Sequence, residues 1–176
     1  EKVAEALALD PTDAALHLAR AEHLHRVALA TVGPARTSAL ETAAAAFTDA
    51  ERISLLKRGA AQKRVERFAE EEKRAARSGR PLALASRAEK TEAETAAVRL
   101  AERAADAAHG GGVVLASLER VDEAAARFEA ALSLCPDRAE SRLQLAMAYY
   151  SLDRQLQALV ELESCTHLRP AWAAAR

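Results

Sequence analysis

Apolar residues recur along the chain at the spacing of an amphipathic helix. The clearest early stripe covers one face over eleven residues: Ala14, Leu18, Ala21 and Leu24. From residue 35 to residue 78 there is no proline and a single glycine, Gly59. This stretch therefore predicts one helix of up to about 40 residues, opened by Ser38 and Glu41 and ended by the Ser, Gly, Arg and Pro at 78–81.

A second long helix is predicted after this break. It starts near Ser86, with Glu89 three residues later as its capping partner, and runs into the apolar positions beyond residue 101. Residues 55–104 then form a helical hairpin with its turn at 78–81. The apolar face of the hairpin thins where residues 70–74 read Glu-Glu-Glu-Lys-Arg, so its tip is expected to be solvated.

Composition supports an all-α protein. The chain of 176 residues has 46 Ala and 23 Leu but only 10 Val plus Ile, so residues that suit a sheet are scarce. No run of about 18 uncharged apolar residues is present, which excludes a membrane-spanning helix. The start shows no secretory signal, and a cytoplasmic (intracellular) location is expected.

Charge is uneven along the chain. The formal net charge is −1, which argues against a uniformly basic nucleic-acid binder, but residues 51–100 alone carry +5. Acids lie among these cations at i,i+3 and i,i+4 spacing, which favours a solvated, self-paired helix. The alternative is a contact arm for an acidic protein or, less favoured, a nucleic acid; its cations would be Lys57, Arg64, Arg67, Lys73, Arg74, Arg77 and Arg80.

Two prolines 34 residues apart, Pro136 and Pro170, mark a repeat near the end of the chain. The later unit has Leu145, Ala146, Tyr149, Ala158 and Leu162 in the slots that the earlier unit fills with Gly111, Gly112, Leu115, Ala124 and Phe128. Small residues allow two helices to cross closely, and large ones fill the layer around the crossing. The pattern predicts helices at 101–118, 122–134, 138–151 and 155–168, with Asp137 and Glu140 forming a capping box.

This spacing resembles the tetratricopeptide repeat (TPR) family, although Arg142 and Leu162 stand where that family has Trp and Phe. The resemblance is strongest over 105–170 and weaker over 1–54, where a helix starts near Thr12 or Asp13. It implies an α-solenoid fragment of helix-turn-helix repeats with an inserted hairpin. The expected organisation is 1–54 degenerate repeat helices, 55–104 basic hairpin, 105–170 two repeats, and 171–176 the start of a further unit or a tail.

Catalytic, metal and cofactor sites are not indicated by the sequence, and no small-molecule substrate is expected. The five His residues lack the i,i+3 or i,i+4 spacing of helical metal ligands, and no Cys/His cluster exists. Cys135 and Cys165 fit as small buried residues in an Ala-rich chain. The Gly110–Gly112 run lacks the Gly-Lys-Ser/Thr ending of a phosphate loop and better fits close helix packing or local flexibility.

The resemblance implies a non-catalytic protein-interaction scaffold. In TPR proteins the first helix of each unit lines a concave groove, which by matching position presents Asp106, His109, Val113, Ala116, Ser117, Glu140, Leu143, Met147, Tyr150 and Ser151. These residues lack the cations that clamp acidic chaperone tails, so the expected ligand is an apolar or amphipathic helix or peptide. The alternatives are a structural subunit of a large cytoskeletal, ciliary or secretion assembly, bridged by the hairpin, or the repeat portion of a larger enzyme.

Overall fold

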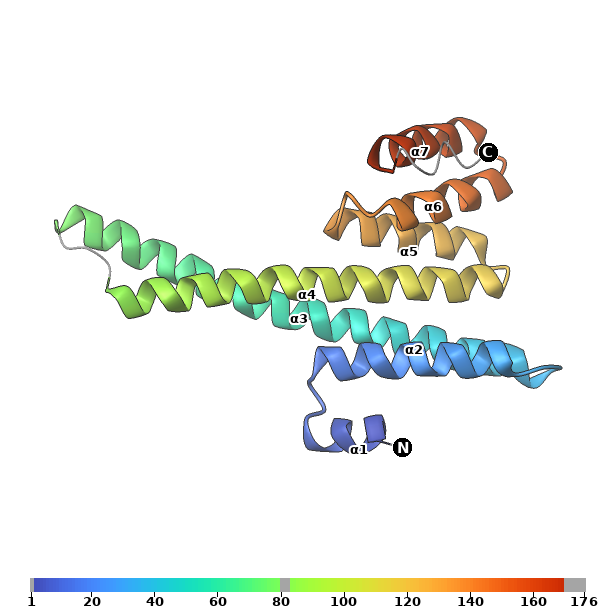
Figure 1. Cartoon of the computed structure of the whole chain (residues 1–176), viewed down its shortest axis with the longest axis horizontal. Helices are drawn as coiled ribbons and strands as arrows, with labels where there is room; N and C mark the ends of the chain where they lie inside the picture. The colour runs from blue at the N-terminus through green and yellow to red at the C-terminus, as the bar shows by residue number, and fades with distance from the viewer. Residues whose placement is uncertain (1, 80–82, 170–176) are drawn as a thin grey trace.

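The structure, a computed structural model, describes residues 2–79 and 83–169. This part of the chain forms an all-α helical repeat fold, as predicted (Figure 1). The helices are α1 Lys2–Leu9, α2 Ala14–Ala30, α3 Ala35–Arg77, α4 Leu84–Ser117, α5 Val121–Leu134, α6 Ala139–Ser151 and α7 Gln155–Leu168.

The long hairpin is confirmed. Helix α3 has 43 residues, which at 1.5 Å per residue is roughly 65 Å of continuous helix. Helix α4 runs without a break from the hairpin into the repeat region. It starts at Leu84, two residues before the predicted Ser86. The predicted turn lies partly outside the described residues, but Gly79 has a φ of +64°, a conformation that glycine adopts readily at a helix end.

Predicted helix caps are right at one position and wrong at three. Asp13 caps α2 through its carboxylate, which accepts from the amides of Ala15 at 2.7 Å and Leu16 at 3.3 Å. Helices α3, α4 and α6 begin instead after Pro34, Ala83 and Arg138, none with a side-chain cap bond, so Ser38, Ser86 and Asp137 are not the caps. At α6 the reason is tertiary, since Arg138 pairs with Asp106 and Glu140 pairs with Arg169.

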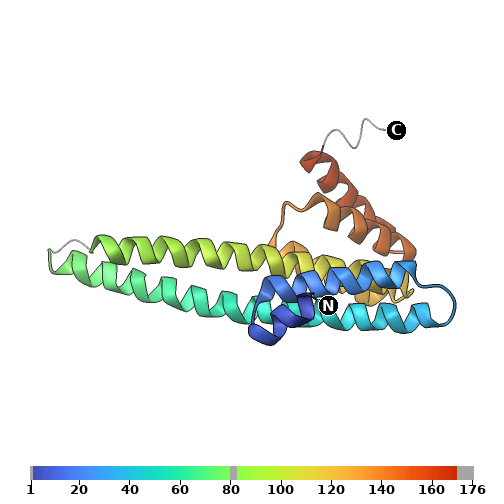
Figure 2. The ribbon, with the colours of Figure 1, turned by 60° about the horizontal axis from the view of Figure 1, so that its bottom comes forward.

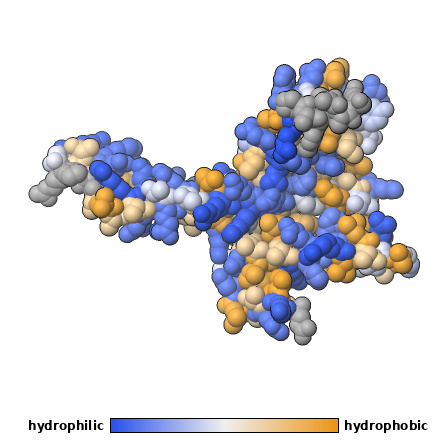
Figure 3. Space-filling view, viewed as in Figure 1, coloured by the Kyte–Doolittle hydropathy of each residue, from blue (hydrophilic) through white to orange (hydrophobic). Residues whose placement is uncertain are grey.

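Small residues let α3 and α4 pack closely along the hairpin. Beyond the repeat region the seam between them buries Ala61 and Phe68 from α3 and Ala93 and Ala101 from α4. An ion pair of 2.7 Å from Lys90 to Glu72 joins the two helices nearer the tip. Figure 2 shows this half of the hairpin extending away from the other helices as an arm, and Figure 3 shows its surface as mostly hydrophilic. We refer to residues 55–79 and 83–97 as the arm.

The glycine run lies where α4 is packed between α3 and α5. A Cβ on Gly110 would lie 2.4 Å from Cε1 of Phe47, and one on Gly112 would lie 2.6 Å from Cε1 of Phe128. Both rings are buried, so neither can move aside freely. The glycines therefore serve close helix packing on two faces of one helix, the first of the two interpretations made from the sequence.

The turn after α4 and the turn after α6 are the same structure 34 residues apart. Glu119 and Asp153 both adopt the left-handed conformation, with φ of 60° and 58°. The next amide closes each turn in the same way: Arg120 N–H donates to the Leu115 carbonyl at 3.0 Å, and Arg154 N–H to the Tyr149 carbonyl at 2.8 Å. The 34-residue spacing of the prolines is thus matched by backbone turns of the same conformation 34 residues apart.

The two larger apolar clusters of the described residues lie on two sides of α4. One joins α2, α3 and α4 around Leu40 and Phe47. The other joins α4 to α7 around Phe128, Leu145 and Tyr149. The predicted division into 1–54, 55–104 and 105–170 stays a prediction, and residues 171–176 lie outside the described chain.

Candidate protein-binding site

The second half of α4 contacts the start of α6, and the two helices run in the same direction there. Arg138 at the start of α6 pairs with Asp106, and three residues further along both helices Ser141 Oγ lies 3.0 Å from His109 Nδ1. Ser141 is fully buried, so its hydroxyl needs a hydrogen-bond partner inside the fold, and His109 supplies one. These contacts fix the register between the two helices.

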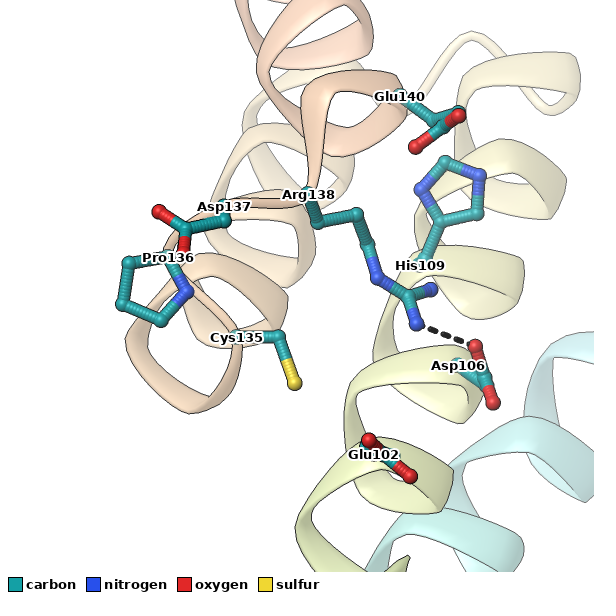
Figure 4. A pocket seen from close by; sticks show the side chains of 8 residues that line it. All are labelled: Glu102, Asp106, His109, Cys135, Pro136, Asp137, Arg138 and Glu140. Atoms are coloured by element: carbon teal, nitrogen blue, oxygen red, sulfur yellow. Dashed lines mark hydrogen bonds and ion pairs between the residues drawn. The ribbon is translucent and has the colours of Figure 1, made fainter. Parts of the chain in front are cut away.

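An open pocket of about 700 Å³ lies where α4 meets the start of α6. Figure 4 shows that its wall comes from α4 on one side and from the turn between α5 and α6 on the other. Its lining residues are Glu102, Asp106, His109, Cys135, Pro136, Asp137, Arg138 and Glu140.

Carboxylates dominate the charge of this pocket. Asp106 is neutralised by Arg138 and Glu140 by Arg169, whereas Glu102 and Asp137 form no ion pair within the described residues. Burial lowers the pKa of His109, and Arg138 lowers it further, so the imidazole is neutral at pH 7. Burial also raises the pKa of the Cys135 thiol, which therefore stays protonated. The pocket is thus a net negative site without a reactive thiolate.

Three of the predicted groove residues, Asp106, His109 and Glu140, meet at the pocket. Farther along α6, Met147 is 55% exposed and Tyr150 is 72% exposed. Leu143 is half-buried between these two regions.

The remaining predicted groove residues differ in availability. Val113 is half-buried and packs against the core around Phe128, so little of it faces a ligand. Ala116 is exposed at the end of α4. The hydroxyls of Ser117 and Ser151 are exposed but donate to the carbonyls of Val113 and Met147 in their own helices, each at 3.0 Å.

Five pocket residues were not predicted as site residues: Glu102, Cys135, Pro136, Asp137 and Arg138. Four of them belong to the turn between α5 and α6, where the sequence suggested only helix punctuation. The signal that could have identified them is the 34-residue repeat itself, because in such a repeat the turn between two units lies close to the neighbouring unit. Because the turn packs against α4, its side chains line the same hollow as Asp106.

The predicted contact arm is exposed in most of its length. Arg64, Arg74 and Arg77 are exposed, and Arg80 lies outside the described residues. Lys57 is half-buried, Lys73 pairs with Glu70 at 2.7 Å, and the Arg67 guanidinium lies 6.0 Å from the centre of the Phe68 ring. Part of the arm's charge therefore pairs within its own helix.

Catalytic and metal chemistry find little support in this geometry. Among the described residues no three His, Cys, Asp or Glu side chains come together as a metal site. Ser141 and His109 are hydrogen-bonded, but a hydroxyl with no exposed surface cannot reach a substrate. Over residues 2–79 and 83–169, no helix has an apolar stretch that could cross a bilayer.

Comparison with known proteins gives only distant likenesses, all to solved structures. No family model matches the chain, and no curated protein matches it. A solved structure described as "YrrB: a TPR protein with an unusual peptide-binding site" matches with 19% identity over 97% of this chain and 93% of that one, at a TM-score of 0.36. At this distance the likeness assigns no site or ligand to the present chain.

Proposed function

We propose that this chain is a non-catalytic protein-interaction scaffold. Its binding surface is the α4–α6 groove, formed by the parallel second half of α4 and α6. The ligand is a peptide or helix that places apolar side chains against Met147 and Tyr150 and points a polar end into the acidic pocket.

The observation that carries the proposal is the exposure of two large apolar side chains on α6, the helix whose first turn lines the pocket. Met147 and Tyr150 lie one turn apart on α6 and are more than half exposed. Tyr is enriched among the residues that dominate binding energy in protein interfaces, and Met adapts its shape to different partners. The two therefore supply anchors, while Glu102 and Asp137 supply unpaired charge nearby.

Peptide selection tests this function directly. A random peptide display library is selected against the purified whole chain, and the affinities of enriched peptides are measured by fluorescence anisotropy. We expect micromolar affinities that fall at least tenfold in the double variant Met147→Glu, Tyr150→Glu. Val32→Glu is the matched control, because Val32 is 85% exposed in the loop between α2 and α3. Binding that survives in the double variant would contradict the proposal.

A second candidate is a structural subunit held in a larger assembly by its arm. The supporting observation is that the arm extends well beyond the other helices and carries exposed cations (Figure 2). Cross-linking of the native protein with a carbodiimide, which couples carboxylates to amines and so reaches both the lysines of the arm and the acids of the groove, distinguishes the two roles. Recurrent links from Lys63 and Lys73 to one neighbouring protein support the assembly role, and links confined to peptides near the groove exclude it.

A further inference from the structure

Helix α2 is held in its core by small side chains. Its buried residues are all alanines, Ala14, Ala21 and Ala28, whereas α3 contributes Leu40 and Phe47 to the core that the two helices share. No ion pair within the described residues involves α2. Because burying a small side chain removes little apolar area from water, α2 is held in this core more weakly than α3.

His25 places a titratable ring in this weakly held interface. Its Nε2 is enclosed and has no hydrogen-bond partner, the one buried side-chain nitrogen or oxygen of the described residues in that state. The imidazole meets the ring of Phe47 edge-on, with centroids 6.2 Å apart and planes 75° from parallel. Phe47 in turn lies directly over Gly110. One line of contacts therefore joins α2, α3 and α4, and His25 is its end on α2.

This environment suits the neutral imidazole and not the charged one. A neutral ring carries a single N–H, which can reside on Nδ1, the nitrogen that is not enclosed. Protonation adds an N–H at Nε2, which is then a buried donor without an acceptor. A buried positive charge without a partner adds a further cost. Protonation of His25 therefore opposes the contact with Phe47.

No nearby acid compensates this charge. Burial is the only cause that lowers the pKa of His25. The acids Asp49, Glu51 and Asp106 form ion pairs with other residues. The charged and titratable residues within four positions of the contact are Glu22, His23 and Arg26 on α2, Asp49 and Glu51 on α3, and Asp106 and His109 on α4, while α1 carries Lys2 and Glu5.

We propose that His25 is an acid-sensitive contact whose protonation releases α2 from α3 and α4. The contact is complete above the pKa of an unfolded His, about 6.5, and weakens as the pH falls toward the lower folded value. Release uncovers Leu40 and Phe47, so the chain presents a new apolar surface in mild acid. This device lies outside the α4–α6 groove and does not depend on the proposed function.

Residue-resolved hydrogen exchange of the whole chain at pH 7 and pH 5 tests this inference. Protection factors, corrected for the intrinsic exchange rate at each pH, are expected to fall at least threefold more over residues 18–28 than over 156–167. His25→Phe keeps a ring against Phe47 but cannot titrate, so it should remove this difference. His23→Gln is the matched control, because His23 is an exposed His on the same helix, and it should leave the difference unchanged.

NMR titration of the His25 ring in the same protein completes the test, with an apparent pKa below that of an unfolded His as the expected result. A value at or above the unfolded one would overturn the inference. So would an equal fall in protection over both segments, or a fall over 18–28 that persists in His25→Phe. If His25→Phe does not fold, His25→Gln also lacks the titration and gives the same readout.

Discussion

The repeat region and the arm share the same two helices but are stabilised differently. In the repeat region α4 has packed helices on more than one side, and large side chains such as Phe128, Leu145 and Tyr149 are buried between them. In the arm, α3 and α4 have only each other, and Phe68 is the one large aromatic side chain buried among small ones in the described residues. Helix α4 thus packs against several helices in the repeat region but only against α3 in the arm.

This contrast bears on function. Segments with few buried apolar contacts open more easily than a core, so the arm is the region where local unfolding should begin. The α4–α6 groove lies on the better-supported side, where the anchors Met147 and Tyr150 project from a packed helix. Binding by rigid elements avoids the entropic cost of ordering the site when a ligand arrives.

The largest expected effect comes from removing a core aromatic ring on each side of the contrast. Phe128→Ala should lower the free energy of unfolding by about 3–5 kcal/mol, because Phe128 is 1% exposed and touches several helices. Phe68→Ala should mainly speed hydrogen exchange in the arm. Urea unfolding and residue-resolved hydrogen exchange measure the two effects. Equal loss of global stability in both variants would contradict the contrast.

Glycine-to-alanine changes should have opposite signs in the two regions. Gly110→Ala and Gly112→Ala force a methyl group against Phe47 and Phe128, and we expect about 1–3 kcal/mol of destabilisation. Gly59 in α3 has open space around its Cβ position, so Gly59→Ala should stabilise by up to about 1 kcal/mol through helix propensity. Thermal unfolding followed by circular dichroism provides the measurement, and destabilisation by Gly59→Ala would count against this packing.

Acid should weaken the packing around His109. The pKa of His109 is lowered in the folded state, mainly by burial, so the unfolded chain binds a proton more readily. Stability is therefore full above the unfolded pKa of about 6.5 and declines as the pH falls through it toward the folded value. We expect the unfolding midpoint of the wild type to fall between pH 7 and pH 5, and to fall less in His109→Gln. An unchanged pH profile in that variant would remove His109 from the explanation.

The smallest effect is expected for charges on the surface of the arm. Lys73→Ala breaks the pair with Glu70, in which both side chains are more than 60% exposed, so the unfolding midpoint should not change measurably. Arg127→Ala should lower it, because Arg127 joins α5 to Glu51 and Thr48 of α3 in a partly buried position. A larger effect at Lys73 than at Arg127 would reverse the comparison.

Local patterns were sufficient to predict the helices. The absence of proline and the scarcity of glycine over 35–79 predicted α3, and the 34-residue spacing of Pro136 and Pro170 predicted α5, α6 and α7 to within one residue at each end. The capping residues were harder to predict. Arg138 and Glu140 form ion pairs with Asp106 and Arg169, distant in sequence, and these interactions replaced the expected cap.

The candidate site was predicted only in part for the same reason. Asp106, His109 and Glu140 were predicted by matching positions in the family that the repeat resembles, and all three line the pocket. Cys135 and Arg138 lie on a turn, and nothing in the local sequence shows that this turn faces α4.

Hydrogen exchange of the whole chain, with and without a display-selected peptide, tests the central claim most directly. The claim is that the α4–α6 groove binds the partner, while the arm does not. We expect slower exchange on binding over residues 98–117 and 138–151, and no change over 63–79 and 84–92. Protection confined to the arm, with the groove unchanged, would contradict the account and favour the arm as the binding element.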